Sequence, residues 1–185
     1  MKRCEWVNLQ NSDYVTYHDE EWGVPVHEDN KLFEMLILEG AQAGLSWETV
    51  LKKRGTYRIA FDGFDPQIVA SYDEDKVALL MQNPGIIRNR LKIKSAIQNA
   101  KVFINLQNEY GSFDAYLWSF VDGKPIVNTP ECLSDVPTKT ALSDEISKAL
   151  KKAGMNFVGS TIIYAYLQAV GVINDHIKGC YISSK

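Results

Sequence analysis

The stretch NPGIIRNRLKIKSAIQNAK, residues 83–101, places a Pro-Gly turn directly before a basic segment with helical spacing. Isoleucines interleaved with the cations predict that the opposite face of this helix packs on the protein. A Pro-Gly turn at a helix N-terminus can present free amide groups and the positive end of the helix dipole, so we expect a hairpin that holds a DNA backbone without reading bases. The charges alone are also consistent with a basic helix face that is exposed to solvent and does not bind DNA. The cations, which have no acid among them, are Arg88, Arg90, Lys92, Lys94 and Lys101.

The segments on either side of this hairpin are also helical in pattern. Residues 29–44 begin with Asp29 or Asn30 as a possible cap and turn one apolar face toward a core. Residues 157–172 are apolar almost all round, which predicts a central helix packed on several sides. We see no β-hairpin, so we predict an all-α domain of roughly eight to ten helices spanning residues 1–185. Other helix boundaries are predicted at Ser46, Pro66, Asp73 and Gly154.

Composition limits the class of protein. A chain of 185 residues with 45% hydrophobic composition can bury the core of one compact domain. A net charge of −3 argues against a general polyanion binder, although local charge can reverse this. No run of 18 apolar residues occurs and no apolar segment follows the first charges, so we expect a cytoplasmic protein without a membrane span. Three cysteines are too few for a disulfide framework.

Four potential metal ligands lie near the two ends of the chain. Cys4 and His18 are near the beginning, and the stretch HIKGC supplies His176 and Cys180. On a helix the last two would point to one face, and two cysteines with two histidines satisfy tetrahedral zinc. The spacing matches no standard zinc finger, so ordinary polar histidines and small apolar cysteines remain an alternative.

A carboxylate lies among aromatic residues in the first quarter of the chain. Glu39 precedes Trp47 by eight residues and follows an apolar helical segment. A carboxylate in an aromatic pocket suits a flat, cationic, amine-bearing ligand such as a modified purine. Aromatic residues at such spacing are also common in a core, and a glutamate can merely sit near a helix end. The upstream aromatic residues are Trp6, Tyr14, Tyr17 and Trp22.

Seven ordered stretches carry a resemblance to a known family: RCEWV, YHDEEWGVP, LFEMLILEGAQAGLSW, GIIRNRLKI, ISKALKK, FVGSTI and NDHIKGC. Through them the chain resembles the 3-methyladenine DNA glycosylase I family from Met1 to about Cys180. The resemblance implies the helix-hairpin-helix DNA glycosylase fold, with two helical lobes and a base pocket between them. It also implies one structural zinc ion that joins the termini through Cys4, His18, His176 and Cys180.

The same resemblance implies roles for individual residues. Glu39 and Tyr17 would hydrogen-bond an extruded base on which Trp47 stacks, and Gln42 and Leu45 would fill the gap in the duplex. The base pocket would be completed by Trp6, Tyr14 and Trp22, and the DNA-binding hairpin would include Gly85, Ile87, Arg88, Arg90 and Lys92.

The implied activity is hydrolysis of the N-glycosidic bond of 3-methyladenine in double-stranded alkylated DNA, a step of base excision repair, by a monomer. Other helix-hairpin-helix glycosylases commonly carry a catalytic aspartate soon after the hairpin, but KIKSAIQNAKVFINLQNEY contains none. We therefore expect the chemistry to rely on a cationic base that leaves without protonation. No lysine matches a Schiff-base role, so we expect a monofunctional enzyme without strand cleavage. A non-enzymatic zinc-stabilised DNA-binding module is the alternative, and a zinc hydrolase would require water in place of one ligand.

Overall fold

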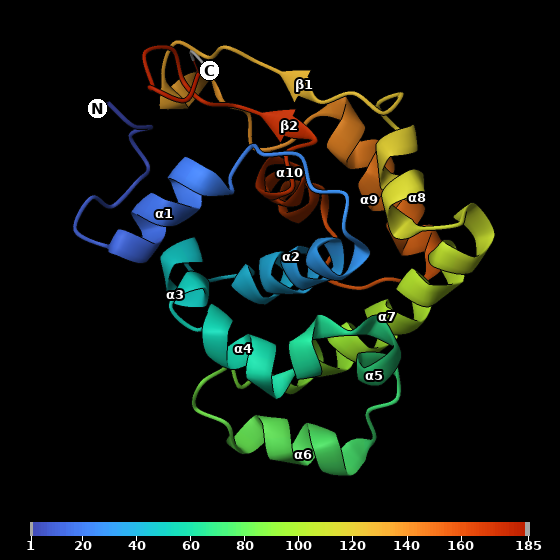
Figure 1. The fold of residues 1–185 in the computed structure, drawn as a ribbon. Helices are drawn as coiled ribbons and strands as arrows, with labels where there is room; N and C mark the ends of the chain where they lie inside the picture. The colour runs from blue at the N-terminus through green and yellow to red at the C-terminus, as the bar shows by residue number, and fades with distance from the viewer. Residues whose placement is uncertain (1, 184–185) are drawn as a thin grey trace.

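A computed structural model describes residues 2–183 and shows that helices form most of this part of the chain (Figure 1). The number of α-helices in it, ten, lies within the predicted range. They are α1 Ser12–Glu20, α2 Asp29–Gln42, α3 Trp47–Leu51, α4 Arg54–Ala60, α5 Pro66–Ala70, α6 Glu74–Gln82, α7 Arg90–Tyr110, α8 Phe113–Ser119, α9 Ala141–Ala153 and α10 Ser160–Ala169. Two short 3-10 helices, η1 Asp62–Phe64 and η2 Leu133–Asp135, complete the set.

Most of the predicted helix boundaries are confirmed. Ser46 and Asp73 are N-caps whose side chains accept the amide hydrogens of Thr49 and Lys76. Pro66 is the first residue of α5, and Gly154 ends α9 with φ of +104°. These residues act within three or four positions of themselves, which is why the local sequence reveals them.

The predicted cap of α2 is wrong. Glu28 occupies the N-cap position and makes no side-chain capping bond. The Asp29 carboxylate instead accepts the amide hydrogens of Phe113 and Asp114, at 3.0 and 2.8 Å, where α8 begins. A carboxylate suited to one helix N-terminus therefore stabilises another that is distant in sequence.

The predicted central helix is present but shorter than residues 157–172. It begins at Ser160 and ends at Ala169, because Phe157 has φ of +54° and Gly159 is extended. A left-handed residue cannot continue a right-handed helix. As predicted, α10 packs on more than one side, against α2 and α9.

The structure adds a small parallel sheet that the sequence did not predict. Strands β1 (Ile126–Val127) and β2 (Ile173–Asn174) pair with Ile126 opposite Ile173. Two residues are too few to show the alternation by which a strand is recognised. The sheet is functionally relevant because β2 leads directly into Asp175 and His176.

Helix α2 lies in the middle of the molecule and contacts α7 and α8 as well as α3 and α10 (Figure 1). Helices α4 to α7 lie on one side of it, while α10 and the two strands lie on the other. The segments near the two ends of the chain meet, and the amide of Tyr181 donates to the carbonyl of Lys2 at 2.9 Å. A single domain with two helical subregions stays a prediction. No helix among residues 2–183 is long and apolar enough to cross a membrane.

Candidate functional site

The predicted aromatic residues surround a cavity of about 210 Å³ beside α1, α2 and α10. All six residues predicted to recognise or enclose a base lie in its wall, although they come from separate segments of the chain. Four lie before α2, one on α2 and one at the start of α3. The lining residues are Trp6, Tyr14, Tyr17, Trp22, Glu39, Gln42, Trp47, Leu133, Val136, Ala165, Gln168, Asp175 and Ile177.

Local helix signals position the aromatic rings. The Asn11 side chain caps α1, whose spacing places Tyr14 and Tyr17 on one face. The ring of Trp6 lies 5.3 Å from that of Tyr14, and the ring of Tyr17 lies 5.2 Å from that of Trp47. Rings at these distances are in ordinary aromatic contact, so the rings support one another in the wall of the cavity.

Glu39 is the buried acid of this cavity. Its side chain belongs to a residue that is only 4% exposed, and its Oε2 atom has no hydrogen-bond partner within residues 2–183. The Nε1 atom of Trp47 is also buried without a partner there. Burial raises the pKa of Glu39 to about 8, so this acid is largely protonated at neutral pH in the folded protein. An unsatisfied acceptor and an unsatisfied donor in one cavity are typical of a ligand site.

A second buried carboxylate, Asp175, was missed by sequence reasoning. It is 2% exposed and lines the same cavity. Its oxygens accept hydrogen bonds from Tyr164 at 2.5 Å, from Gln168 at 2.7 Å and from Asn128 at 2.7 Å. Three neutral donors hold this carboxylate in place. Its only signal in the sequence is its position beside His176.

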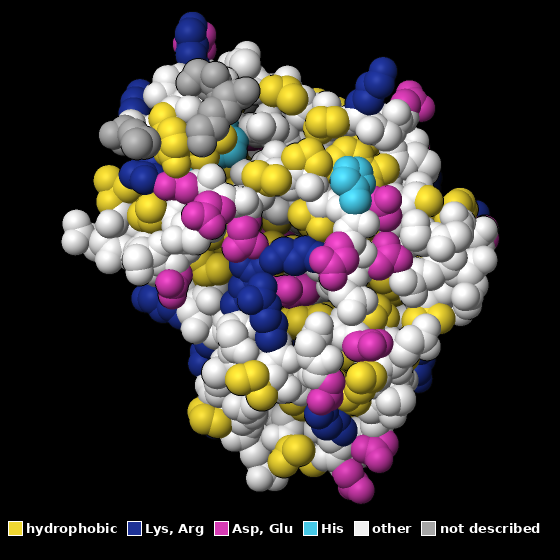
Figure 2. Space-filling model, viewed as in Figure 1, with side chains coloured by type: hydrophobic (Ala, Val, Ile, Leu, Met, Phe, Trp, Pro, Cys, Tyr) yellow, Lys and Arg dark blue, Asp and Glu magenta, His cyan; other side chains and the backbone are white. Residues whose placement is uncertain are grey.

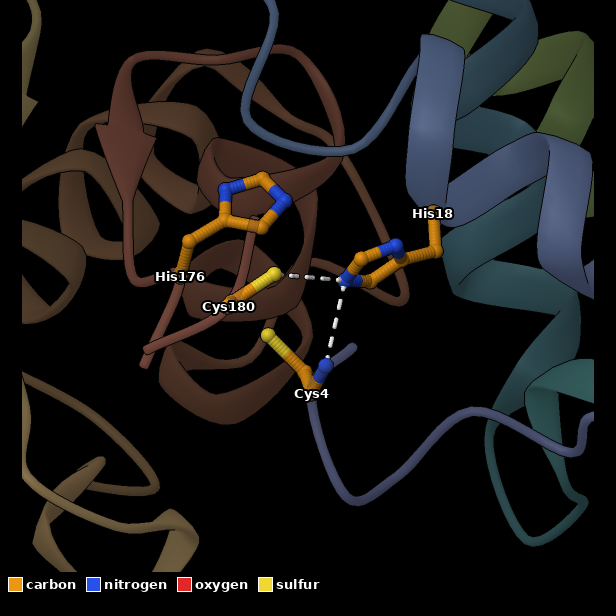
Figure 3. A group of neighbouring side chains, drawn as sticks. All are labelled: Cys4, His18, His176 and Cys180. Atoms are coloured by element: carbon orange, nitrogen blue, oxygen red, sulfur yellow. Dashed lines mark hydrogen bonds between the residues drawn. The ribbon is translucent and has the colours of Figure 1, made fainter. Parts of the chain in front are cut away.

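The predicted metal ligands also come together. Cys4, His18, His176 and Cys180 are all buried, and one ligand atom of each lies within 4.8 Å of the others. Figure 3 shows the two cysteines and the His18 ring converging from the first segment, α1 and the C-terminal segment. The Sγ atom of Cys180 lies 3.6 Å from Nε2 of His18. The stretch HIKGC is not helical, because residues 175–177 have no regular structure and residues 178–179 form a turn.

Polar neighbours orient both imidazoles of this cluster. Nδ1 of His18 donates to Asp19 at 2.8 Å, and Arg3 holds that carboxylate with a contact of 2.7 Å. Nδ1 of His176 donates to the Asn174 side-chain oxygen at 2.8 Å. Both Nε2 atoms are therefore free of protons, and that of His176 is buried without a partner among the described residues.

The donor set fits zinc. Burial raises the pKa of Cys4 to about 12 and lowers the pKa of His176 to about 4. Neutral imidazoles are the form that binds a metal, and a metal converts buried thiols to thiolates. Four protein donors would complete a tetrahedral site.

The metal cluster and the cavity share their walls. Tyr17 lines the cavity and His18 belongs to the cluster, while Asp175 and Ile177 flank His176. The ring of Trp22 lies 4.7 Å from that of His176. Anything that fixes the cluster therefore also fixes one side of the aromatic cavity.

The turn before α7 is packed on α4. A Cβ atom on Gly85 would lie 2.8 Å from Cβ of Thr56, so only glycine fits there. Two amides of the turn already have partners: that of Gly85 donates to the Asn83 side chain at 2.8 Å, and that of Ile87 donates to the Tyr57 hydroxyl at 3.0 Å. The prediction of free amide groups at these two positions is therefore wrong for the protein without DNA, because neighbouring side chains satisfy them.

The basic segment is less free than its sequence indicates. Glu74 of α6 pairs with Arg90 and, at 2.5 Å, with Lys94. Lys92 points inward to backbone carbonyl groups of α2. Arg88 is exposed and makes no ion pair within residues 2–183. Elsewhere on the molecule, the face in Figure 2 shows basic side chains at its centre with acidic side chains beside them.

Comparisons with known proteins agree with one another. The sequence model of a family described as methyladenine glycosylase matches residues 6–183. DNA-3-methyladenine glycosylase 1 of Escherichia coli is 51% identical over 97% of this chain and 96% of its own length. DNA-3-methyladenine glycosylase of Haemophilus influenzae is 48% identical, over 96% of each chain.

Solved structures give the same result. A crystal structure of 3-methyladenine DNA glycosylase I superposes with a TM-score of 0.94 at 51% identity, covering 97% of this chain and 98% of that one. A tyrosine-to-phenylalanine variant of such an enzyme, solved in complex with 3-methyladenine, gives a TM-score of 0.95 at 35% identity over 100% and 99% of the two chains. The chain belongs to the methyladenine glycosylase family.

Proposed function

We propose that the protein is a DNA glycosylase of base excision repair that releases 3-methyladenine from alkylated double-stranded DNA by hydrolysing its N-glycosidic bond. Relatives named for this activity cover almost the whole chain. The observation that carries the proposal is Glu39, a buried acid with an unpartnered oxygen in a cavity walled by aromatic rings. An acid that a cation can ionise, beside flat aromatic surfaces, suits a cationic purine.

The substrate base enters the cavity only after it has left the stack of the duplex, and a damaged base leaves at lower cost than a normal one. Trp47 stacks on the base, Tyr17 hydrogen-bonds it, and Glu39 accepts a hydrogen bond from the exocyclic amine. A cation beside Glu39 lowers the pKa of the carboxyl group, so base binding favours its ionised form. Adenine carries no such charge and is therefore discriminated against. Gln42 and Leu45 fill the gap that the base leaves.

The chemistry depends on the base as leaving group. A base that is already cationic departs as a neutral molecule, so the enzyme need not protonate it. The stretch KIKSAIQNAKVFINLQNEY after the hairpin contains no aspartate, which is consistent with a reaction that needs no catalytic acid to protonate the base. Glu39 recognises the base, and water completes the hydrolysis without a covalent lysine intermediate, so the DNA strand stays intact.

We propose a structural role for one zinc ion held by Cys4, His18, His176 and Cys180. Bound zinc would supply only a cross-link between the two ends of the chain, since four protein ligands leave no open position for a reacting water.

We also propose that α6, the turn at Gly85 and α7 form a helix-hairpin-helix element that contacts the DNA backbone, with Arg88 as its free cation. Gly85 and Ile87 shape the turn. We propose that the protein acts in the cytoplasm as a monomer.

The second candidate is a zinc-stabilised DNA-binding module without activity, in which the aromatic residues are only core. Titration with free 3-methyladenine separates the two, since three of the four tryptophans line the cavity. We expect saturable quenching of tryptophan fluorescence in the wild-type protein and weaker binding in Trp47→Ala. Unchanged fluorescence at all concentrations would favour the second candidate.

A further inference from the structure

Lys92 differs from the other cations of the basic segment in the direction of its side chain. It is half-buried, and its Nζ donates to the carbonyl oxygens of Ala41 at 2.8 Å and Ala43 at 2.6 Å. Both acceptors belong to the C-terminal end of α2, which is 49 to 51 residues away in sequence. An ammonium group that donates to two carbonyls inside the protein is poorly placed to reach a phosphate.

The end of α2 needs such a cation. The last carbonyl groups of a helix have no amide partners within the helix and carry its negative dipole end. The last turn of α2 contains no basic residue of its own. Lys92 therefore supplies from α7 the charge that α2 lacks.

The loop held in this way lies beside the aromatic cavity. A second cavity of about 280 Å³ shares Glu39, Gln42 and Ala165 with the first, and Gly44 and Leu45 form part of its wall. Gly44 has φ of +79° and no atom within 4 Å of the position that a Cβ would take. Leu45 is 42% exposed. Within the loop the amides of Ala43 and Leu45 donate to the carbonyls of Gly40 and Gln42, and Lys92 ties the loop to α7.

We infer that Lys92 is a positioning residue, which holds the loop after α2 so that Gln42 and Leu45 can fill the gap left by the extruded base. This inference rests on the proposed function. It assigns Lys92 to the opening of the duplex rather than to contact with phosphate. Its loss should impair excision from double-stranded DNA, where a gap must be filled, and spare excision from single strands, where none exists.

The test compares single-turnover release of 3-methyladenine from double-stranded and single-stranded alkylated DNA. The variant Lys92→Met keeps the aliphatic stem and removes both hydrogen bonds. We expect release from the duplex to fall about ten-fold, and release from the single strand to change by less than about two-fold, as two lost hydrogen bonds to a charged group would allow. The salt dependence of duplex binding should stay unchanged, and Lys92→Arg should restore part of the duplex rate.

Two variants serve as controls. Lys94→Met removes a neighbouring cation that is paired with Glu74, and the ratio of the two rates should not change. Arg88→Met should make the salt dependence shallower by about one phosphate contact. Lys92→Gln replaces Lys92→Met if the latter does not fold.

Each other outcome contradicts the inference. A shallower salt slope in Lys92→Met would make Lys92 a phosphate contact. Equal losses on both substrates, with a lower melting temperature, would make it a stabilising residue only, and unchanged rates would remove it from the reaction. Wild-type protein that releases no 3-methyladenine from either substrate would instead overturn the proposed function.

Discussion

The aromatic cavity and the basic segment of residues 83–101 differ in whether their polar groups have partners. In the cavity, Glu39 and Trp47 are buried and keep polar atoms without partners. In the hairpin, Arg90 and Lys94 are exposed but both pair with Glu74. A buried unsatisfied group is costly to the folded protein and is therefore informative about a ligand, whereas an exposed charge can be neutralised by any neighbour. Local charge in a sequence therefore overstates the charge that is available to contact DNA.

The largest effect should come from breaking the cluster that fixes the cavity wall. We expect His176→Ala or Cys180→Ser to lower the free energy of unfolding by several kcal/mol, since structural zinc sites contribute on the order of 10 kcal/mol in small domains. The rate of base release per folded molecule should change little, whereas the free energy of unfolding should fall. Metal analysis with thermal unfolding checks this, and Cys132→Ser, outside the cluster, is the control. Folded, active wild-type protein without stoichiometric metal would contradict the zinc proposal.

The cost of burying Glu39 should appear as a pH dependence of stability. Burial raises the pKa of Glu39 from 4.5 to about 8, so between these values the folded protein holds a proton that the unfolded chain releases. Stability therefore falls as pH rises from about 5 to 8. Glu39→Gln should remove this contribution, gaining on the order of a few kcal/mol at pH 8 relative to pH 5. Chemical denaturation at both pH values measures it, with Glu20→Gln as an exposed control. A gain independent of pH would contradict the burial argument.

The same substitution should separate recognition from binding of DNA. Glu39→Gln keeps the shape of the side chain but removes its negative charge and one acceptor. Losing a hydrogen bond to a charged group costs about 1.5 to 3 kcal/mol, so release of 3-methyladenine should fall roughly 10-fold to 100-fold. Affinity for undamaged duplex should be nearly unchanged. If base release and affinity for undamaged duplex fell equally, Glu39 would have only a structural role.

The smallest effect should come from the hairpin, where the pairing can be reversed. Glu74→Gln releases Arg90 and Lys94, so the salt dependence of duplex binding should become steeper by about one to two phosphate contacts. Arg88→Ala should make it shallower by about one. Binding measured from 50 to 200 mM salt distinguishes them, and equal slopes in all three proteins would place the DNA on another face.

The fold could be predicted from the sequence to the extent that its signals are local. Caps such as Ser46 and Asp73 act within a few residues, and the sequence identifies them. Asp29 acts across 84 residues on α8, and Lys92 acts across 51 residues on α2, so the pattern around each gave the wrong partner or none. The two-residue strands are too short to have a pattern at all.

The site was predictable in its residue types and not in its arrangement. The aromatic residues and Glu39 were selected because their chemistry suits a cationic base, and the structure brings them to one cavity. Asp175 and Gln168 were missed, since an acid beside a histidine and a glutamine within an apolar helix have ordinary alternatives. Only the folded chain shows that they meet in the same wall.

The most direct test of the central claim is incubation of the protein with double-stranded DNA that carries methylated bases, followed by separation and identification of the bases released. We expect 3-methyladenine to appear in solution, the strand to remain uncut, and Glu39→Gln to release the base much more slowly while still binding the duplex. If the wild-type protein binds this DNA and releases no base, the proposed glycosylase activity is wrong and the protein is a DNA-binding module.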